Sequence, residues 1–172
     1  MYDFRTGSNP GESITLEKVT SNGITVLHLD DDSEFLELFK KKIKDKTDSI
    51  EIIDTDSPER ALEIIEEEEI DCVISDYDIP GMDGIEFMEE VREKYERLPF
   101  ILLTGKGSEE IPSRMIWRAA DYFSKSSDET YEVLVNRIEN LVSRYRTKEA
   151  LEQNYEMFRS LMETHPRHNR GA

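Results

Sequence analysis

The chain has 172 residues, of which 39 are acidic and 22 basic, and its net charge of −17 argues against nucleic acids and anionic membrane surfaces as partners. Its one cysteine, Cys72, excludes an internal disulfide bond and is typical of a reducing compartment. No apolar run approaches the roughly 20 residues that a membrane span needs, and the N-terminus lacks the apolar core of a signal peptide, so we expect a soluble, cytoplasmic chain.

The N-terminal part of the sequence predicts a leader, a strand and a helix. Residues 1–22 contain Gly, Ser, Asn, Pro and Thr with little periodicity, which indicates a flexible leader. Residues 24–29 are mostly branched apolar residues, which favours a buried strand, and three aspartates, 30–32, follow it. From Ser33 onward the spacing of apolar residues is helical. The predicted inward-facing residues of this helix are Phe35, Leu36, Phe39 and Ile43.

Two more strands follow, with a helix between them. Residues 50–54 predict a short strand, and Ser57 before Pro58 is typical of a helix N-cap followed by proline at the first helical position. Residues 70–75 predict a buried strand that ends abruptly at Asp76. This carboxylate therefore lies at the carboxyl end of a strand, which is the edge where ligands bind in open α/β sheets.

The alternation of strand and helix continues to the end of the domain. We expect helices over residues 85–95 and 109–120, strands over 99–103 and 121–124, and a last helix from about residue 128. Five strands that alternate with five helices through short connections predict right-handed crossovers and a mostly parallel sheet. The nearly continuous apolar strands are typical of a sheet that is covered on both faces.

Five polar side chains follow strand ends in this arrangement, and parallel strands bring these ends to one edge. They are Asp30, Asp31, Asp76, Thr104 and Lys125. Taken singly, each fits a helix cap, a turn residue or a surface charge. Together, three carboxylates would repel one another without cations, and oxygen ligands of this kind suit Mg²⁺. A magnesium ion, an ammonium and a hydroxyl form a cradle for a phosphoryl group, and one carboxylate could be the nucleophile that forms an acyl phosphate.

Four short motifs contain these residues. In chain order they are Leu29–Asp32 (LDDD), Ser75–Gly84 (SDYDIPGMDG), Leu103–Gly105 (LTG) and Tyr122–Lys125 (YFSK). In this order and at this spacing they resemble the receiver domain of two-component response regulators, over about residues 23 to 145. The resemblance implies a flavodoxin-like fold, a doubly wound parallel α/β sheet in the order 2-1-3-4-5, with the site at the switch between strands 1 and 3.

The resemblance also implies the chemistry of the site. Asp76 would accept a phosphoryl group from a phosphohistidine of a histidine kinase or a phosphotransfer protein. Asp31 and Asp76 would ligate Mg²⁺ directly, together with the backbone carbonyl of Asp78, and Asp30 would act mainly through a bound water. The chain would then be a phosphoacceptor signalling module and not an enzyme, although a longer parent protein could be a histidine kinase.

The same resemblance gives catalytic roles to Lys125 and Thr104, beside Asp76, and switch roles to Thr104 and Tyr122. Lys125 would pair with Asp76 and later with the phosphoryl group. Thr104 would donate a hydrogen bond to a phosphoryl oxygen, and Tyr122 would turn inward as that bond forms. One departure from the family pattern follows the lysine, because Ser126 stands where the family usually has proline, and we therefore expect a rebuilt loop after Lys125. The stretch from Thr104 to Tyr122 is also slightly short for the family, which predicts a short or shifted fourth helix.

The C-terminal residues predict a long helix whose role stays open. Two apolar series have near-heptad spacing, with an offset of one residue between them: Leu134, Ile138, Leu141 and Tyr145, and then Leu151, Tyr155, Phe158 and Met162. Either this helix pairs with a second copy as a homodimer, or it ends in a mobile tail. We divide the chain into a leader (1–22), a receiver domain (23–146) and a linker helix with tail (147–172). Residues 152–162 also resemble the helix that leads into PAS sensor domains, as in the front part of a sensor histidine kinase.

Two alternatives to the phosphoacceptor interpretation fit parts of the sequence. Asp76 and Asp78 form an Asp-x-Asp pair, which is typical of some phosphohydrolases and phosphotransferases, but such enzymes have the pair after the first strand. The other alternative is a receiver-like docking domain that is never phosphorylated. The complete acidic set argues against that alternative, whereas the altered loop after Lys125 argues for it.

Overall fold

The computed structural model describes residues 23–105, 121–125 and 128–164, and for residues 128–130 it describes the backbone only. In chain order the elements are β1 (Ile24–Leu29), α2 (Ser33–Lys46), β2 (Ile50–Thr55), α3 (Pro58–Glu67), β3 (Cys72–Asp76), α4 (Gly84–Lys94), β4 (Phe100–Thr104), β5 (Asp121–Ser124) and α6 (Asp128–Glu163). Within these residues, every helix is too short or too polar to cross a membrane.

The five strands form one parallel sheet in the order β2-β1-β3-β4-β5, which confirms the predicted flavodoxin-like fold. The chain moves outward from β1 to β2 and then returns to the other side of β1 to form β3. This reversal of direction creates the switch point between β1 and β3, where ligands bind in sheets of this class. The expected long C-terminal helix is also present, as α6.

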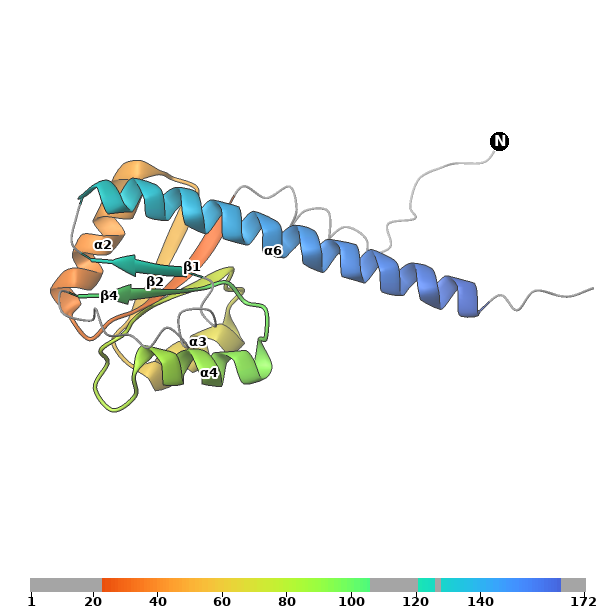
Figure 1. Cartoon of the computed structure of the whole chain (residues 1–172), viewed down its shortest axis with the longest axis horizontal. Coiled ribbons are helices and arrows are strands. Elements are labelled where there is room, and N and C mark those ends of the chain that lie inside the picture. Colours follow the sequence, from red (N-terminus) through yellow and green to blue (C-terminus); the bar gives the residue numbers. More distant parts are fainter. Residues whose placement is uncertain (1–22, 106–120, 126–127, 165–172) are drawn as a thin grey trace, which may run out of the picture. The chain divides into compact units, whose positions relative to one another are not determined.

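Two separate apolar layers cover the sheet, because successive side chains of a strand point to opposite faces. On one face, Leu27 and Val73 pack with α3 and α4. On the other face, Val26 and Ile74 pack with α2 and with the residues of α6 up to Val142. Figure 1 shows α3 and α4 together on one side of the strands, with α2 on the opposite side. The central strands are therefore buried on both faces, which explains their nearly continuous apolar sequence.

Short polar side chains begin the helices at the positions that the sequence indicates. The Asp32 side chain accepts hydrogen bonds from two backbone N–H groups of α2, and the Ser57 side chain caps α3 directly before Pro58. Asp83 and Glu86 form a reciprocal capping box at the start of α4. These caps satisfy N–H groups that have no partner within the helix.

The third strand differs from its predicted bounds, since it spans Cys72–Asp76 and not residues 70–75. Asp71 is excluded from the strand ladder, although its backbone N–H donates to the carbonyl of Thr25 at 2.9 Å. Its carboxylate takes the place of a backbone acceptor, because Thr25 N donates to Asp71 Oδ2 at 2.9 Å. The strand thus starts two residues later and includes Asp76 as its last residue, which places the carboxylate on a rigid element.

The compact unit that contains the sheet spans Asn22–Val142, so its boundary falls inside α6. The helix itself continues without a break to Glu163. Several predicted features lie outside the described residues: the leader at 1–22, the helix at 109–120, Ser126 and the tail from 165.

Candidate functional site

The site lies where β1 and β3 end side by side. Their register pairs Leu29 with Ser75, so the next residues, Asp30 and Asp76, leave neighbouring strands at the same edge. Asp30 is fully buried, and Asp76 is 6% exposed. The Asp30 backbone is fixed from the other side, because its N–H donates to the carbonyl of Thr55 at 3.2 Å.

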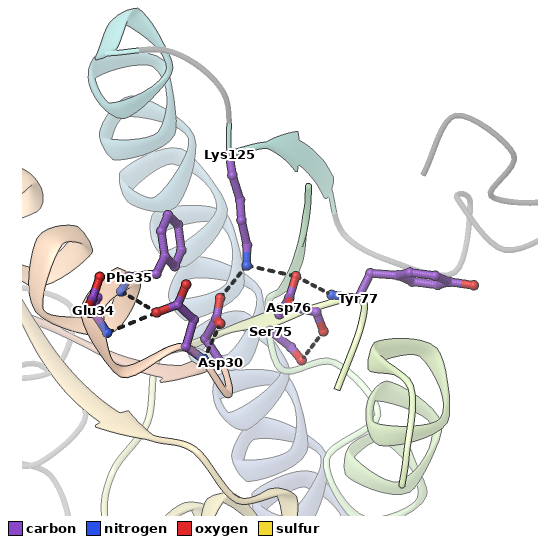
Figure 2. Close-up of polar contacts among 8 residues, drawn as sticks. Asp30, Glu34, Phe35, Ser75, Asp76, Tyr77 and Lys125 are labelled. Carbon is purple, nitrogen blue, oxygen red and sulfur yellow. Dashed lines mark hydrogen bonds and ion pairs between the residues drawn. The ribbon is translucent and has the colours of Figure 1, made fainter. Parts of the chain in front are cut away.

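Three carboxylates and one ammonium meet at this edge. Asp30, Asp31 and Asp76 each place an oxygen within 4.8 Å of the other two, and Asp31 is the exposed member. Lys125 follows β5, and its Nζ lies 2.6 Å from Asp30 Oδ2 and 3.1 Å from Asp76 Oδ1. Figure 2 shows the lysine side chain reaching between the two buried carboxylates. Residues from three strand ends are thus brought together, and the oxygen atoms form a group that could hold a metal ion.

The electrostatics of the cluster single out Asp76. Burial raises the pKa of the Asp76 carboxyl group above its ordinary value; Lys125 opposes this increase, and the charge of Asp30 adds to it. Burial alone would lower the pKa of Lys125, but the hydrogen bond and charge of Asp30 raise it above its ordinary value. Lys125 is therefore an ammonium at neutral pH, and it offsets part of the repulsion between the two carboxylates.

A hydroxyl pair lies beside the carboxylates at the end of β4. Thr104 is buried, and its Oγ1 donates to the hydroxyl oxygen of Tyr122 on β5 at 2.7 Å. Tyr122 is only half-buried, so its ring lies between the sheet and solvent. The structure thus shows a Thr104–Tyr122 hydrogen bond, whereas the inward turn of Tyr122 stays a prediction.

The segment after β3 contacts the Asp76 carboxylate through one backbone N–H group. Tyr77 N donates to Asp76 Oδ1 at 2.9 Å, and Gly84 N donates to the carbonyl of Tyr77 at 2.8 Å. Gly81, in the turn between Tyr77 and Gly84, adopts a positive φ of 86°, a conformation that favours glycine. Asp78 has an exposed side chain in this segment, and the role of its backbone carbonyl as a metal ligand stays a prediction.

Sequence reasoning missed two contributors to the site. Phe35 was predicted only as part of the apolar stripe of α2, yet its ring lies 4.4 Å from Lys125 Nζ. Gly84 is named above only as the last residue of the SDYDIPGMDG motif, yet it packs against the backbone of Asp76 and Tyr77. Helical spacing identifies Phe35 as inward-facing but does not identify the residue that it contacts. An Asp-Gly pair indicates a turn but not a close approach between two backbones.

A comparison with known protein families decides the identity of the domain. The family model for the response regulator receiver domain matches residues 26–139. The chain belongs to the response regulator receiver domain family. The match extends from β1 into α6, and all four motifs lie inside it.

Relatives and solved structures agree with this membership. The response regulator protein FleR of Pseudomonas aeruginosa is 38% identical over 76 residues, which is 44% of this chain and 16% of FleR. A receiver domain structure from Clostridium thermocellum has a TM-score of 0.63 at 26% identity and covers 72% of this chain and 98% of its own. The chemotaxis response regulator CheY4 of Vibrio cholerae shares the fold, with a TM-score of 0.59, 22% identity and coverage of 67% and 98%. The receiver domain thus matches a small part of FleR and nearly all of the two solved domains.

Proposed function

We propose that this receiver domain is a phosphoacceptor and that Asp76 takes a phosphoryl group from the phosphohistidine of a histidine kinase or phosphotransfer protein. The observation that carries the proposal is the convergence of Asp30, Asp31, Asp76 and Lys125 on one edge of the sheet. In the transfer, an Asp76 oxygen forms a bond to phosphorus as the phosphorus–nitrogen bond to the imidazole breaks. The resemblance of the chain to response regulators supports this donor chemistry.

Asp76 suits the acceptor role better than the two other carboxylates. Asp30 is fully buried and held by Lys125 at 2.6 Å and by the backbone N–H of Asp32 at 3.0 Å. Asp31 is exposed, where neighbouring charges are screened by water. Among the described residues, the contacts to the Asp76 carboxylate from Lys125 and Tyr77 both use Oδ1. We assign Oδ2 as the attacking oxygen for this reason.

The acidic group fits Mg²⁺ as the cofactor. Its three carboxylates face only one ammonium among the described residues, and hard oxygen ligands are those that Mg²⁺ prefers. Asp31 and Asp76 would hold the ion with the backbone carbonyl of Asp78, and Asp30 would act through a bound water. When bound, the ion would neutralise charge that develops on the transferred phosphoryl group.

Lys125, Thr104 and Tyr122 would convert phosphorylation into a change of surface. Lys125 already contacts Asp76, so its ammonium needs only a small movement to pair with a phosphoryl oxygen. Thr104 donates to Tyr122 in this structure and would have to exchange that acceptor for a phosphoryl oxygen. The hydroxyl of Tyr122 then loses its partner, which would favour an inward position of the ring. The partner-binding surface would change as a consequence.

Incubation with acetyl phosphate and Mg²⁺ tests this function. We expect intact mass spectrometry to show one phosphoryl group per chain, because a single carboxylate is the acceptor. Addition of EDTA before the donor should prevent labelling, since without Mg²⁺ the repulsion from the carboxylates would oppose the arrival of an anionic donor. Many turnovers of donor per chain would favour a phosphohydrolase instead, and an unlabelled chain would favour a docking domain that is not phosphorylated.

We also propose that the C-terminal part of α6 pairs with a second copy of the chain, within the division into a receiver domain (23–146) and a linker helix with tail (147–172). Six large apolar side chains of this helix are between 52% and 67% exposed: Leu151, Tyr155, Met157, Phe158, Leu161 and Met162. Four of them follow the 4-3-4 spacing of a coiled-coil seam. Glu152 and Arg159 flank that seam with opposite charges, which suits self-association.

Replacing Phe158 by glutamate is expected to weaken this self-association at least about tenfold, because a central aromatic contact is replaced by a charge. Sedimentation equilibrium over a range of concentrations would measure the change. Ser160→Glu is the matched control, since it adds the same charge at an exposed position of the same helix. A wild-type chain that stays monomeric at all concentrations would contradict the proposed pairing.

A further inference from the structure

The ammonium of Lys125 has a third neighbour that is not an acid. Its Nζ lies over the ring of Phe35, 4.4 Å from the ring centre, in addition to its contacts with Asp30 at 2.6 Å and Asp76 at 3.1 Å. Figure 2 shows the Phe35 ring beside the lysine side chain, on the side away from Asp76. A cation within about 6 Å of a ring centre is attracted by the negative face of the ring. Lys125 is thus held by two carboxylates and one aromatic face.

The backbone of Phe35 is anchored by the motif that also supplies the acidic residues. Asp32 is the N-cap of α2, and its Oδ1 accepts a hydrogen bond from Phe35 N at 3.1 Å. Asp32 N in turn donates to Asp30 Oδ1 at 3.0 Å. Two consecutive hydrogen bonds therefore link the backbone of Phe35 to Asp30.

Two other aromatic rings pack against Phe35. His28 meets it edge-on at 5.8 Å and 70°, and Phe39 lies at 6.0 Å. His28 is fully buried, and burial together with the nearby charge of Lys125 lowers its pKa to about 3. The cluster presents an aromatic surface to Lys125.

We propose that Phe35 is a positioning residue whose ring holds the Lys125 ammonium between Asp30 and Asp76, ready to pair with the phosphoryl group on Asp76. Asp30 is the closer of the two carboxylates and would draw the ammonium away from the acceptor. The Phe35 ring occupies the side of the ammonium that faces away from Asp76 and restricts its movement in that direction. The ammonium therefore stays within reach of both carboxylates. The Lys125 side chain is only 19% exposed, and cation–ring attraction is stronger where water is excluded. The functional part of this inference rests on the proposed phosphoacceptor function, whereas the contact between the two side chains does not.

The variants Phe35→Leu and Phe35→Tyr distinguish the effect of the aromatic ring from the effect of an apolar side chain at this position. Leucine keeps an apolar side chain without the ring face, and tyrosine keeps the face. With acetyl phosphate at saturating Mg²⁺, we expect the phosphorylation rate constant of Phe35→Leu to fall about fivefold, which corresponds to about 1 kcal/mol. The half-saturating Mg²⁺ concentration should change less than about twofold, because Phe35 contacts the lysine and not the carboxylates. Phe35→Tyr should restore the rate constant.

A double-mutant cycle tests the contact without any phosphorylation. The cycle compares the unfolding equilibrium constants of the wild type, Phe35→Leu, Lys125→Met and the double variant. We expect a coupling of about threefold or more, since each single change removes the same contact. As a second measurement, nuclear magnetic resonance should find the ε-methylene protons of Lys125 shifted upfield by the ring. That shift should disappear in Phe35→Leu and persist in Phe35→Tyr, even where Lys125→Met does not fold.

Phe39→Leu is the matched control, because Phe39 belongs to the same aromatic cluster but contacts Phe35 at 6.0 Å, His28 at 4.1 Å and Tyr131 at 5.7 Å, whereas the lysine ammonium lies over Phe35. It should destabilise the fold with weaker coupling to Lys125→Met than Phe35→Leu shows. Equal coupling for Phe39→Leu, absence of coupling for Phe35→Leu, or a Phe35→Tyr variant as slow as Phe35→Leu would each overturn the positioning role. If the wild type accepts no phosphoryl group but the cycle shows coupling, the phosphoacceptor function fails while the contact stands.

Discussion

Replacement of Asp76 by asparagine is expected to abolish labelling of the chain by acetyl phosphate and Mg²⁺. An amide oxygen is a poor nucleophile compared with a carboxylate, and it is a weaker ligand for a hard cation. The shape of the side chain is almost unchanged, and its oxygen can still accept the hydrogen bond that Tyr77 N donates to Oδ1 at 2.9 Å. Intact mass spectrometry would show the loss of the phosphoryl group, without the unfolding that a larger change could cause.

Asp56→Asn is the matched control for this experiment. Asp56 directly follows β2, so it is also an aspartate beyond a strand end, but its side chain is exposed and it is outside the acidic group. We expect this variant to be labelled like the wild type. Labelling of Asp76→Asn to the same stoichiometry would show that the acceptor is another residue.

The stability of Asp76→Asn provides an internal check that the variant is folded. Burial raises the pKa of Asp76 in the folded state, so the unfolded chain loses this proton first as the pH rises. The wild type therefore loses stability as the pH rises through the two pKa values, and asparagine does not. Like charges about 5 Å apart repel by about 3 kcal/mol at an effective dielectric constant of about 20, and Lys125 offsets part of this. We expect the variant to be about 1 kcal/mol more stable at neutral pH, with the difference vanishing in acid.

Replacement of Gly84 by alanine is expected to produce the largest loss of stability of any single methyl group in the site. A Cβ at this position would collide with the carbonyl oxygen of Asp76 and lie 2.8 Å from Leu102 Cδ2. The backbone of Asp76 cannot move freely, because it is part of the ladder between β3 and β4. The first turn of α4 would have to move instead and would lose the hydrogen bond from Gly84 N to the Tyr77 carbonyl.

We expect Gly84→Ala to lower the free energy of unfolding by about 3 kcal/mol, at the upper end of the range for overpacked sites. Urea denaturation followed by circular dichroism would measure it. Gly105→Ala is the matched control, because a Cβ there has no atom of the described residues within 4 Å, and it should change stability by less than about 1 kcal/mol. Equal stability of the two variants would show that α4 can shift away from β3 at no cost.

Several elements were predictable because their signals are local. The bounds of β1 and β5 match the prediction at both ends, since branched apolar residues favour strands and polar residues follow them. The Ser57 cap and Pro58 mark the start of α3 in the sequence as they do in the structure. The start of β3 was wrong by two residues, because the Asp71 side chain replaces a backbone acceptor and no pattern of apolar residues reveals that.

The sequence by itself determined the order of strands and helices, the parallel sheet and the acidic and basic residues that reach one edge. Those properties follow from apolar periodicity, helix caps and the fixed hand of crossovers, which act over a few residues at a time. Only the tertiary structure decided that Lys125 lies closer to Asp30 than to Asp76, that Phe35 faces its ammonium and that Gly84 touches the Asp76 backbone. Lys125 and Asp30 are 95 positions apart, so their separation depends on how whole strands and helices pack.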